Sequence, residues 1–189
     1  MLPTSPRVRI HQRRVSFEGF KRADGLWEIE AQLIDSKDHD CPFPSGLRQA
    51  GEPIHAMWLR VTIDVQMNIL AVEAKTSAAP FLGLCETILP DYEKIVGLNL
   101  FEGFLKKVKE LFGGAQGCTH ISELLMSLPT AALQSMSGEN LDRELTQKPY
   151  HLDRCHAMVS HSPMVRRYYP RWHQRSEEQA ERAELAEKA

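Results

Sequence analysis

The sequence lacks the features that mark membrane, exported and nucleic-acid-binding proteins. No apolar run approaches the roughly 20 residues that a membrane-spanning helix needs. The first residues contain no apolar stretch of the kind found in secretory signal peptides. The formal net charge is -2 at pH 7, so no overall electrostatic attraction to nucleic acid is expected. We therefore expect a cytoplasmic protein whose partners include neither a membrane nor a nucleic acid.

Common catalytic and nucleotide-binding motifs are also missing. The sequence has no P-loop, no G-x-G-x-x-G, no H-E-x-x-H, no G-x-S-x-G and no paired C-x-x-C. Cysteine is scarce, and without export disulfide bonds are not expected. The four cysteines are therefore expected to be free thiols or metal ligands, and they are Cys41, Cys85, Cys118 and Cys155.

The composition is that of an ordinary globular protein. Of the 189 residues 42% are hydrophobic and 25% are charged, which is enough for one sizeable core and too little for two. We expect a flexible lead-in over residues 1–12 and a single α+β domain over residues 13–173. A charged helical tail is expected over residues 174–189.

Alternating apolar and polar residues predict an antiparallel sheet of about four strands. A short strand is expected around 15–17, and a second over 26–33 follows the turn signal Asp24-Gly25. Residues 36–53 contain three prolines and are expected to form a loop. A second hairpin is predicted over 57–74, with one apolar face that includes Leu59 and Val61.

The period changes to that of helices after Pro80. A short helix broken by Pro90 is expected over 84–96, and an amphipathic helix is expected over 104–112. The strongest helical pattern covers 119–136, for which Thr119 is a candidate N-cap. Residues 152–172 are expected to form a strand or an irregular segment. The fold class predicted is α+β, with helices covering one face of the sheet.

Cys118 and His120 are the first candidates for chemistry. Cys118 directly precedes the predicted helix of residues 119–136, where free N–H groups and the positive end of the helix dipole favour a thiolate. His120 is only two positions away, so sulfur and imidazole can share one small surface. A buried free cysteine beside a surface histidine is the alternative, and for an isolated C-x-H it is the better one.

His55 and Cys85 are a second candidate pair. His55 begins the first strand of the second hairpin and Cys85 follows its last strand, so the hairpin brings the two positions near each other. Taken alone, His55 is better read as a satisfied histidine at the edge of the core. Whether Cys155 and His156 join such a site is left open by their spacing.

Several segments resemble a bacterial family catalogued as a domain of unknown function. The resemblance spans about Arg13 to Trp172, and the family name implies no activity. The segments that carry it include Asp24-Gly25-Leu26-Trp27-Glu28-Ile29-Glu30, Gly51-Glu52-Pro53-Ile54-His55-Ala56-Met57-Trp58, Gly117-Cys118-Thr119-His120-Ile121-Ser122-Glu123-Leu124-Leu125 and Tyr169-Pro170-Arg171-Trp172.

The order of features from Pro53 to Met136 also resembles the iron–sulfur assembly scaffold family of the NifU N-terminal type. In that family a ligand cysteine precedes a strand, a second precedes a helix and a third begins a late helix. His55, Cys85 and Cys118 match these three positions, and His120 is a further candidate ligand. The resemblance implies a scaffold-like fold and a Cys/His site for zinc or iron.

Three functions follow from these observations. The first is a metal-binding protein that uses His55, Cys85, Cys118 and His120, with Zn²⁺ or iron held for a structural, delivery or catalytic role. The second is a non-catalytic accessory subunit that docks on a bacterial enzyme, or a chain that forms a homo-oligomer. The third is a thiol enzyme with Cys118 as nucleophile and His120 as base.

Overall fold

A computed structural model of the chain describes residues 5–138 and 147–174. The chain forms two compact units, Met1–Ser135 and Met136–Ala189. The single domain predicted for residues 13–173 spans both units, so its boundaries stay predictions. Most of the predicted charged tail, residues 175–189, lies outside the described residues.

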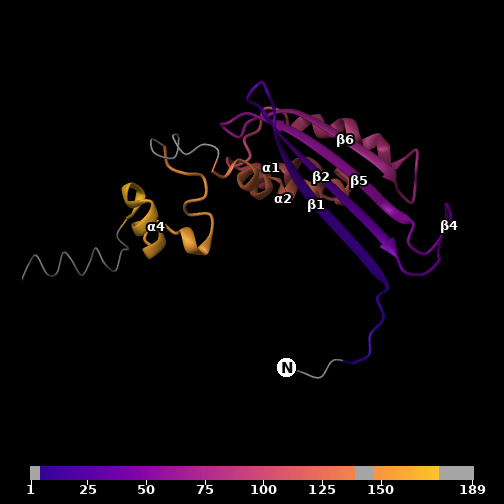
Figure 1. Ribbon diagram of the computed structural model, residues 1–189. Helices are drawn as coiled ribbons and strands as arrows, with labels where there is room; N and C mark the ends of the chain where they lie inside the picture. Colours follow the sequence, from indigo (N-terminus) through magenta and orange to yellow (C-terminus); the bar gives the residue numbers. More distant parts are fainter. Residues whose placement is uncertain (1–4, 139–146, 175–189) are drawn as a thin grey trace, which may run out of the picture. The chain divides into compact units, whose positions relative to one another are not determined.

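The first unit is built on a four-stranded antiparallel sheet with the order β1-β2-β5-β6 (Figure 1). The strands are β1 (His11–Lys21), β2 (Trp27–Lys37), β5 (Pro53–Ile63) and β6 (Ile69–Ala78). The predicted loop over 36–53 is corrected in part, because it holds a small separate hairpin of β3 (Cys41–Phe43) and β4 (Gly46–Arg48). Gly46 permits this tight turn because its φ of 123° is one that side chains rarely adopt.

Helical segments follow the sheet in the chain order predicted. They are η1 (Cys85–Ile95), α1 (Phe104–Phe112), η2 (Gly114–Gln116) and α2 (Thr119–Met136). The bounds of α1 and α2 agree with the predictions. The segment around Pro90 forms a 3-10 helix and no α-helix, since proline lacks the N–H that an α-helical hydrogen bond requires.

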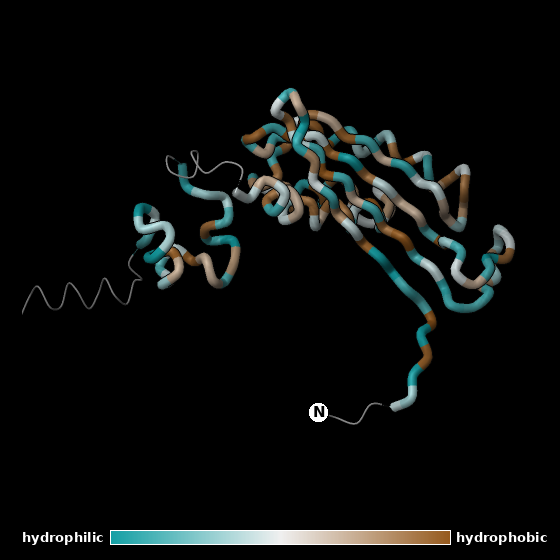
Figure 2. The backbone as a smooth tube through the Cα atoms, in the orientation of Figure 1, coloured by the Kyte–Doolittle hydropathy of each residue, from teal (hydrophilic) through white to brown (hydrophobic). Residues whose placement is uncertain are grey.

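The core lies between the sheet and these helices. Every second residue of β2 from Trp27 to Leu33 is buried, and Leu59 and Val61 of β5 are fully buried on the same side. The helices contribute the other half of the core. Their buried side chains include Phe104, Val108, Phe112, Ile121, Leu124, Leu125, Leu128 and Ala132. Except for Ala132, each of these side chains contributes roughly 1.5–3 kcal/mol on burial. Figure 2 shows the alternation of hydrophobic and hydrophilic residues along the strands. The predicted α+β class and the inward direction of Leu59 and Val61 are thus confirmed.

Two contacts define the direction of α2 along the inner face of the sheet. Near its C-terminal end, Ser135 packs so closely on β1 that a Cβ at Gly19 would lie 2.0 Å from its Oγ. Near its N-terminal end, His120 lies beside Asp35, close to the end of β2. The beginning of α2 therefore faces the sheet where β2 ends and β5 begins, and the candidate site forms there.

The second unit contains three short helical segments, η3 (His156–Met158), α4 (Pro163–Tyr168) and η4 (Pro170–Trp172). Ser162 caps α4 by accepting a hydrogen bond from the Val165 N–H at 3.2 Å. The strand or irregular segment predicted for 152–172 is therefore corrected, because three short helices lie within it. Among the residues that the structure describes, no helix is both long enough and apolar enough to cross a membrane.

Candidate metal site

Asp35 is the one charged side chain that is buried among the described residues, with 3% of its surface exposed. It continues the buried row of β2 that runs through Trp27, Ile29, Ala31 and Leu33. Alternation therefore turns its carboxylate toward the helices and away from solvent. A buried carboxylate is costly unless it is paired, so its neighbours decide what this position can do.

Two side chains of β1 bind the Asp35 carboxylate from the sheet side. Arg13 stands directly opposite Asp35 in the β1–β2 register and donates from Nε to Oδ1 and from Nη2 to Oδ2, both at 2.8 Å. His11 Nε2 donates to Oδ1 at 3.0 Å. Arg13 also donates to Glu123 of α2. This two-pronged arginine contact fixes the plane of the carboxylate.

His55 reaches the same carboxylate from the other neighbouring strand. Asp35 pairs with His55 in the β2–β5 register, whereas the next residue of β2, Ser36, pairs with Pro53. Ile54 is thus an extra residue in β5, and such a bulge redirects the side chains next to it. His55 Nδ1 lies 3.2 Å from Asp35 Oδ2 and donates a hydrogen bond to it.

His120 lies on the first turn of α2 and reaches the Asp35 carboxylate from the helix side of the sheet. The Ser122 N–H donates to the Cys118 carbonyl at 2.9 Å, so Cys118 and not the predicted Thr119 occupies the N-cap position. The buried Tyr92 hydroxyl accepts from the Cys118 N–H at 2.9 Å and anchors this helix start to η1. Gly117 is required there because a Cβ would lie 2.7 Å from the Phe112 carbonyl oxygen.

Ligand atoms of Asp35, His55 and His120 lie within 4.8 Å of one another. His120 Nε2 is 3.5 Å from Asp35 Oδ2, and the two imidazole rings have centroids 3.8 Å apart. Both histidine side chains are about one-fifth exposed. The three residues, called the Asp–His–His cluster, therefore place a buried carboxylate beside two partly exposed imidazole rings.

The electrostatics of the cluster favour an ionised Asp35. Burial alone raises the pKa of this carboxyl, but hydrogen bonds from Arg13 and His11 and the charge of Arg13 outweigh it. The result is a pKa lowered to about 2. Asp35 is therefore a carboxylate at every physiological pH.

The two histidines of the cluster are biased toward their neutral forms. Burial lowers the pKa of His55, although the Asp35 carboxylate opposes the shift. Burial also lowers the pKa of His120, and the neighbouring His55 and Arg13 add to the effect. A neutral imidazole binds a metal ion through its unprotonated nitrogen, so the cluster offers one carboxylate and, once the ring proton of His55 moves from Nδ1 to Nε2, two ring nitrogens.

The sequence-predicted ligands are divided by the structure. His55 and His120 come together as proposed. Cys118 Sγ lies 3.9 Å from His120 Nδ1, whereas the other ring nitrogen of His120, Nε2, faces Asp35. Cys118 is therefore not part of the cluster. Cys85 begins η1, beyond the six residues that follow β6, and is not part of the cluster either. Metal binding by the two cysteines stays a prediction.

Sequence reasoning missed Asp35, Arg13 and His11. Asp35 is the next member of the apolar row after Leu33, so extending the alternation by one step would have placed it on the core face. A charged residue in such a row is a signal, because a buried carboxylate needs partners. No pattern marked Arg13 and His11, since most residues of β1 are exposed on both faces.

Fold and site together define a class: an α+β protein with a four-stranded antiparallel sheet and an Asp–His–His cluster under the first turn of a covering helix. Residues 11–134 match the family described as "Protein of unknown function (DUF2889)". Since this match covers more than half of the chain, the chain belongs to that family, and the resemblance to a family of unknown function is confirmed. The matched segment contains the whole cluster.

No curated protein and no solved structure matches the chain. The likeness to the iron–sulfur assembly scaffolds therefore stays a resemblance in the order of features.

Proposed function

We propose that this protein binds a divalent transition metal, Zn²⁺ or Fe²⁺, through Asp35, His55 and His120. The observation that supports the proposal is the convergence of two histidine nitrogens on the one buried carboxylate of the described residues. Two histidines with one carboxylate form a ligand set that both metals use.

The spacing of the ligand atoms supports the proposal. Ligand atoms bound to one tetrahedral zinc ion at 2.0–2.2 Å stand roughly 3.4 Å from each other. Asp35 Oδ2 lies 3.2 Å from His55 Nδ1 and 3.5 Å from His120 Nε2, which brackets that value. The ring centroids of two histidines bound to one such ion are about 5 Å apart. The present centroid distance is 3.8 Å, so the imidazoles must spread by rather more than 1 Å on binding.

Arg13 and His11 would hold the carboxylate while a metal binds. They contact it from the β1 side, whereas His55 and His120 contact Oδ2 from β5 and α2. Such outer contacts orient a ligand and are a regular part of metal sites. When an ion binds, Asp35 Oδ2 would lose only the hydrogen bond from His55.

Three protein ligands leave room for a further ligand. Structural zinc sites are closed by four protein ligands, whereas catalytic sites keep one position for water or substrate. The cluster is partly open to solvent, with His11 and Arg13 at its rim. These features favour an open metal position over a purely structural one.

The test uses the full-length, untagged protein, stripped with a chelator and reloaded with Zn²⁺ or, without oxygen, with Fe²⁺. We expect one ion per chain by elemental analysis after desalting. His120→Ala and Asp35→Asn should lower bound metal sharply, whereas His39→Ala and Cys41→Ser, which change residues away from the cluster, should not. Ligand present at 100 times its Kd stabilises the fold by about 2.7 kcal/mol. That figure corresponds to a rise in Tm of roughly 5–10 °C.

No bound ion, or equal loading of the His120→Ala variant, would refute the proposal. Loading that depends on Cys85 and Cys118 in place of Asp35 would restore the sequence-based ligand set.

A second candidate function uses the thiol of Cys118, because its sulfur lies 3.9 Å from an imidazole nitrogen of His120. Imidazole within reach of a thiol can activate it as a nucleophile. Iodoacetamide separates the two candidates when applied to metal-free and metal-loaded protein. If Cys118 is alkylated quickly and the His120→Ala change slows the reaction, a thiol function is supported. If neither the His120→Ala change nor bound metal alters the rate, only the metal proposal is left.

A further inference from the structure

Strand β1 is an edge strand of the sheet, and no other described strand pairs with its outer side (Figure 1). It is 11 residues long and most of its side chains are exposed. The opposite edge of the sheet, at β6, is partly covered: the Ile69 N–H donates to the Leu98 carbonyl, and the Ile69 carbonyl accepts from the Gly97 N–H. A long open edge of this kind presents unpaired N–H and C=O groups that pair readily with another strand.

The register identifies which residues of β1 present these groups. In the pairing with β2 the residue numbers of partners sum to a constant, with no bulge along the strand. The Asp38 N–H donates to the Ile10 carbonyl, and the Arg22 N–H donates to the Leu26 carbonyl. At both ends of this ladder the even-numbered residues therefore direct their backbone N–H and C=O groups toward β2. Hydrogen-bonded pairs alternate with unbonded ones in an antiparallel ladder. Odd-numbered residues such as Val15 and Phe17 therefore direct their N–H and C=O groups outward.

We propose that the open edge pairs with the β1 strand of a second copy of this chain, antiparallel about a two-fold axis at Ser16. Outward-directed residues then meet each other, and Val15 of one copy stands opposite Phe17 of the other. Val15 is 43% exposed in the single chain, and this pairing would cover it. The two four-stranded sheets would join into one of eight strands.

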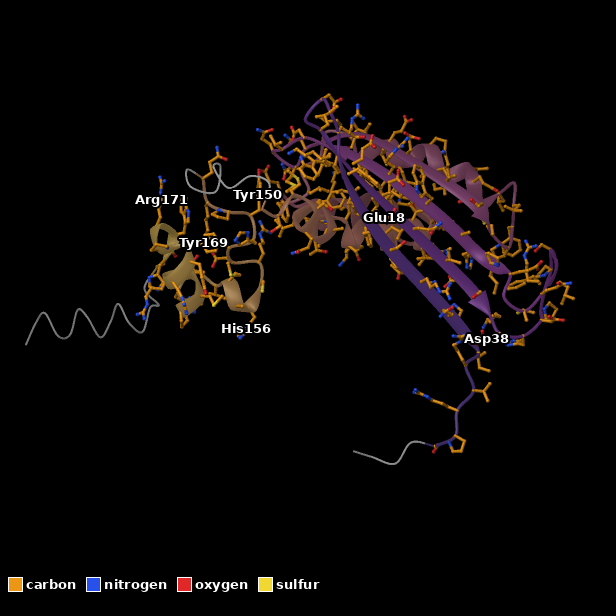
Figure 3. All side chains as sticks on the ribbon, in the orientation of Figure 1. Glu18, Asp38, Tyr150, His156, Tyr169 and Arg171 are labelled. Atoms are coloured by element: carbon orange, nitrogen blue, oxygen red, sulfur yellow. The ribbon has the colours of Figure 1, made fainter. Side chains whose placement is uncertain are left out.

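Charge complementarity selects this register. Pairing about Ser16 places Arg14 of each copy opposite Glu18 of the other, so two opposite-charge pairs form on the outer face. Figure 3 shows Glu18 on β1. Shifting the axis to Phe17 would place Arg13 opposite Lys21, which are like charges, and shifting it to Val15 would lose the Arg14–Glu18 pairs. Opposite charges directly across an antiparallel pair stabilise it, and like charges destabilise it.

The first test is the mass of the full-length protein in solution, measured by sedimentation equilibrium over a wide concentration range. We expect a reversible dimer. Arg14→Glu and Glu18→Arg, each alone, convert both pairs into repulsive ones and should raise the dimer Kd roughly 5- to 50-fold. The double variant restores both pairs in the opposite sense and should return the Kd close to that of the unchanged protein.

The second test uses proline, which removes a backbone N–H. Val15→Pro removes an outward N–H that the β1–β2 ladder does not use, so it should abolish the dimer and leave the monomer folded by circular dichroism. Ser16→Pro removes an N–H that the ladder does use, so it should destabilise the monomer itself.

A chain that stays monomeric throughout overturns the proposal, as does a dimer that Val15→Pro leaves intact. A double charge variant that remains as weak as the single ones also overturns it. If a monomer shows slow amide exchange at Val15 and Phe17, another segment covers the edge, and the second copy is excluded.

Discussion

Replacing Asp35 by asparagine should destabilise the protein by about 2–3 kcal/mol even without metal. The change keeps the shape of the side chain but removes the charge that Arg13 and His11 bind. Breaking one partner of a buried ion pair costs about 3–5 kcal/mol, and Arg13, which is 34% exposed, recovers part of this through water. The lowered pKa of Asp35 gives a similar figure, since a shift from 3.8 to about 2 corresponds to roughly 2–3 kcal/mol.

Denaturant unfolding followed by tryptophan fluorescence measures this change, because Trp27 is buried in the core. Asp38→Asn is the matched control: Asp38 pairs with Arg9 at the surface, so its replacement should cost less than about 1 kcal/mol. The pH dependence adds a second readout. A lowered pKa contributes stability that is present above about pH 4 and is lost as the pH falls toward 2. The difference between unchanged protein and Asp35→Asn should therefore shrink over that window. A cost below about 0.5 kcal/mol at pH 7 would refute the role assigned to Asp35.

Two further predictions concern the packing of α2 and the protonation of the cluster. Gly19→Ala should destabilise the protein by about 1–3 kcal/mol in denaturant unfolding, because the new Cβ would lie 2.0 Å from Ser135 Oγ; adding Ser135→Gly should restore most of the loss. The metal-free protein should lose stability as the pH falls below 6.5, because the unfolded chain binds protons at His55 and His120 before the folded one does. Zinc affinity, measured by competition with a chelating dye, should fall over the same range; an affinity that rises on acidification contradicts the assigned ligands.

The helices and central strands could be predicted because burial imposes a clear period on them. In β2 and β5 one face packs against helices and the other meets solvent, which gives the alternation seen at Leu59 and Val61. Strand β1 is longer than the three residues predicted, since a strand exposed on both faces has no such period. Its length is set by the backbone pairing with β2, which leaves no mark on side-chain polarity.

The candidate site could be predicted only in part. The position of His55 at the start of a hairpin strand and that of His120 two residues after Cys118 indicate both histidines, whereas carboxylates are common and only burial distinguishes Asp35 from the rest. The bulge at Ile54, which changes the β2–β5 register next to His55, follows from the pairing of two strands and has no local signal. Cysteines attract attention in a search for ligands, yet Cys85 begins η1 beyond the strand that was expected to place it beside His55.

The two ring nitrogens of His120 give Cys118 a role outside the proposed metal shell. Nε2 faces Asp35 Oδ2 at 3.5 Å, and Nδ1 faces Cys118 Sγ at 3.9 Å. A neutral imidazole carries one proton, so the lone pair of one nitrogen is available only while the proton is on the other. Donation from Nδ1 to the sulfur therefore leaves the Nε2 lone pair facing a carboxylate oxygen, an arrangement that is repulsive unless a cation lies between them. A hydrogen-bond acceptor at the outer nitrogen of a ligand histidine is the usual way in which proteins fix its tautomer. Cys118→Ala should on this reasoning weaken metal binding roughly tenfold or more while the stoichiometry stays at one ion. Loss of the ion itself would instead make Cys118 a direct ligand.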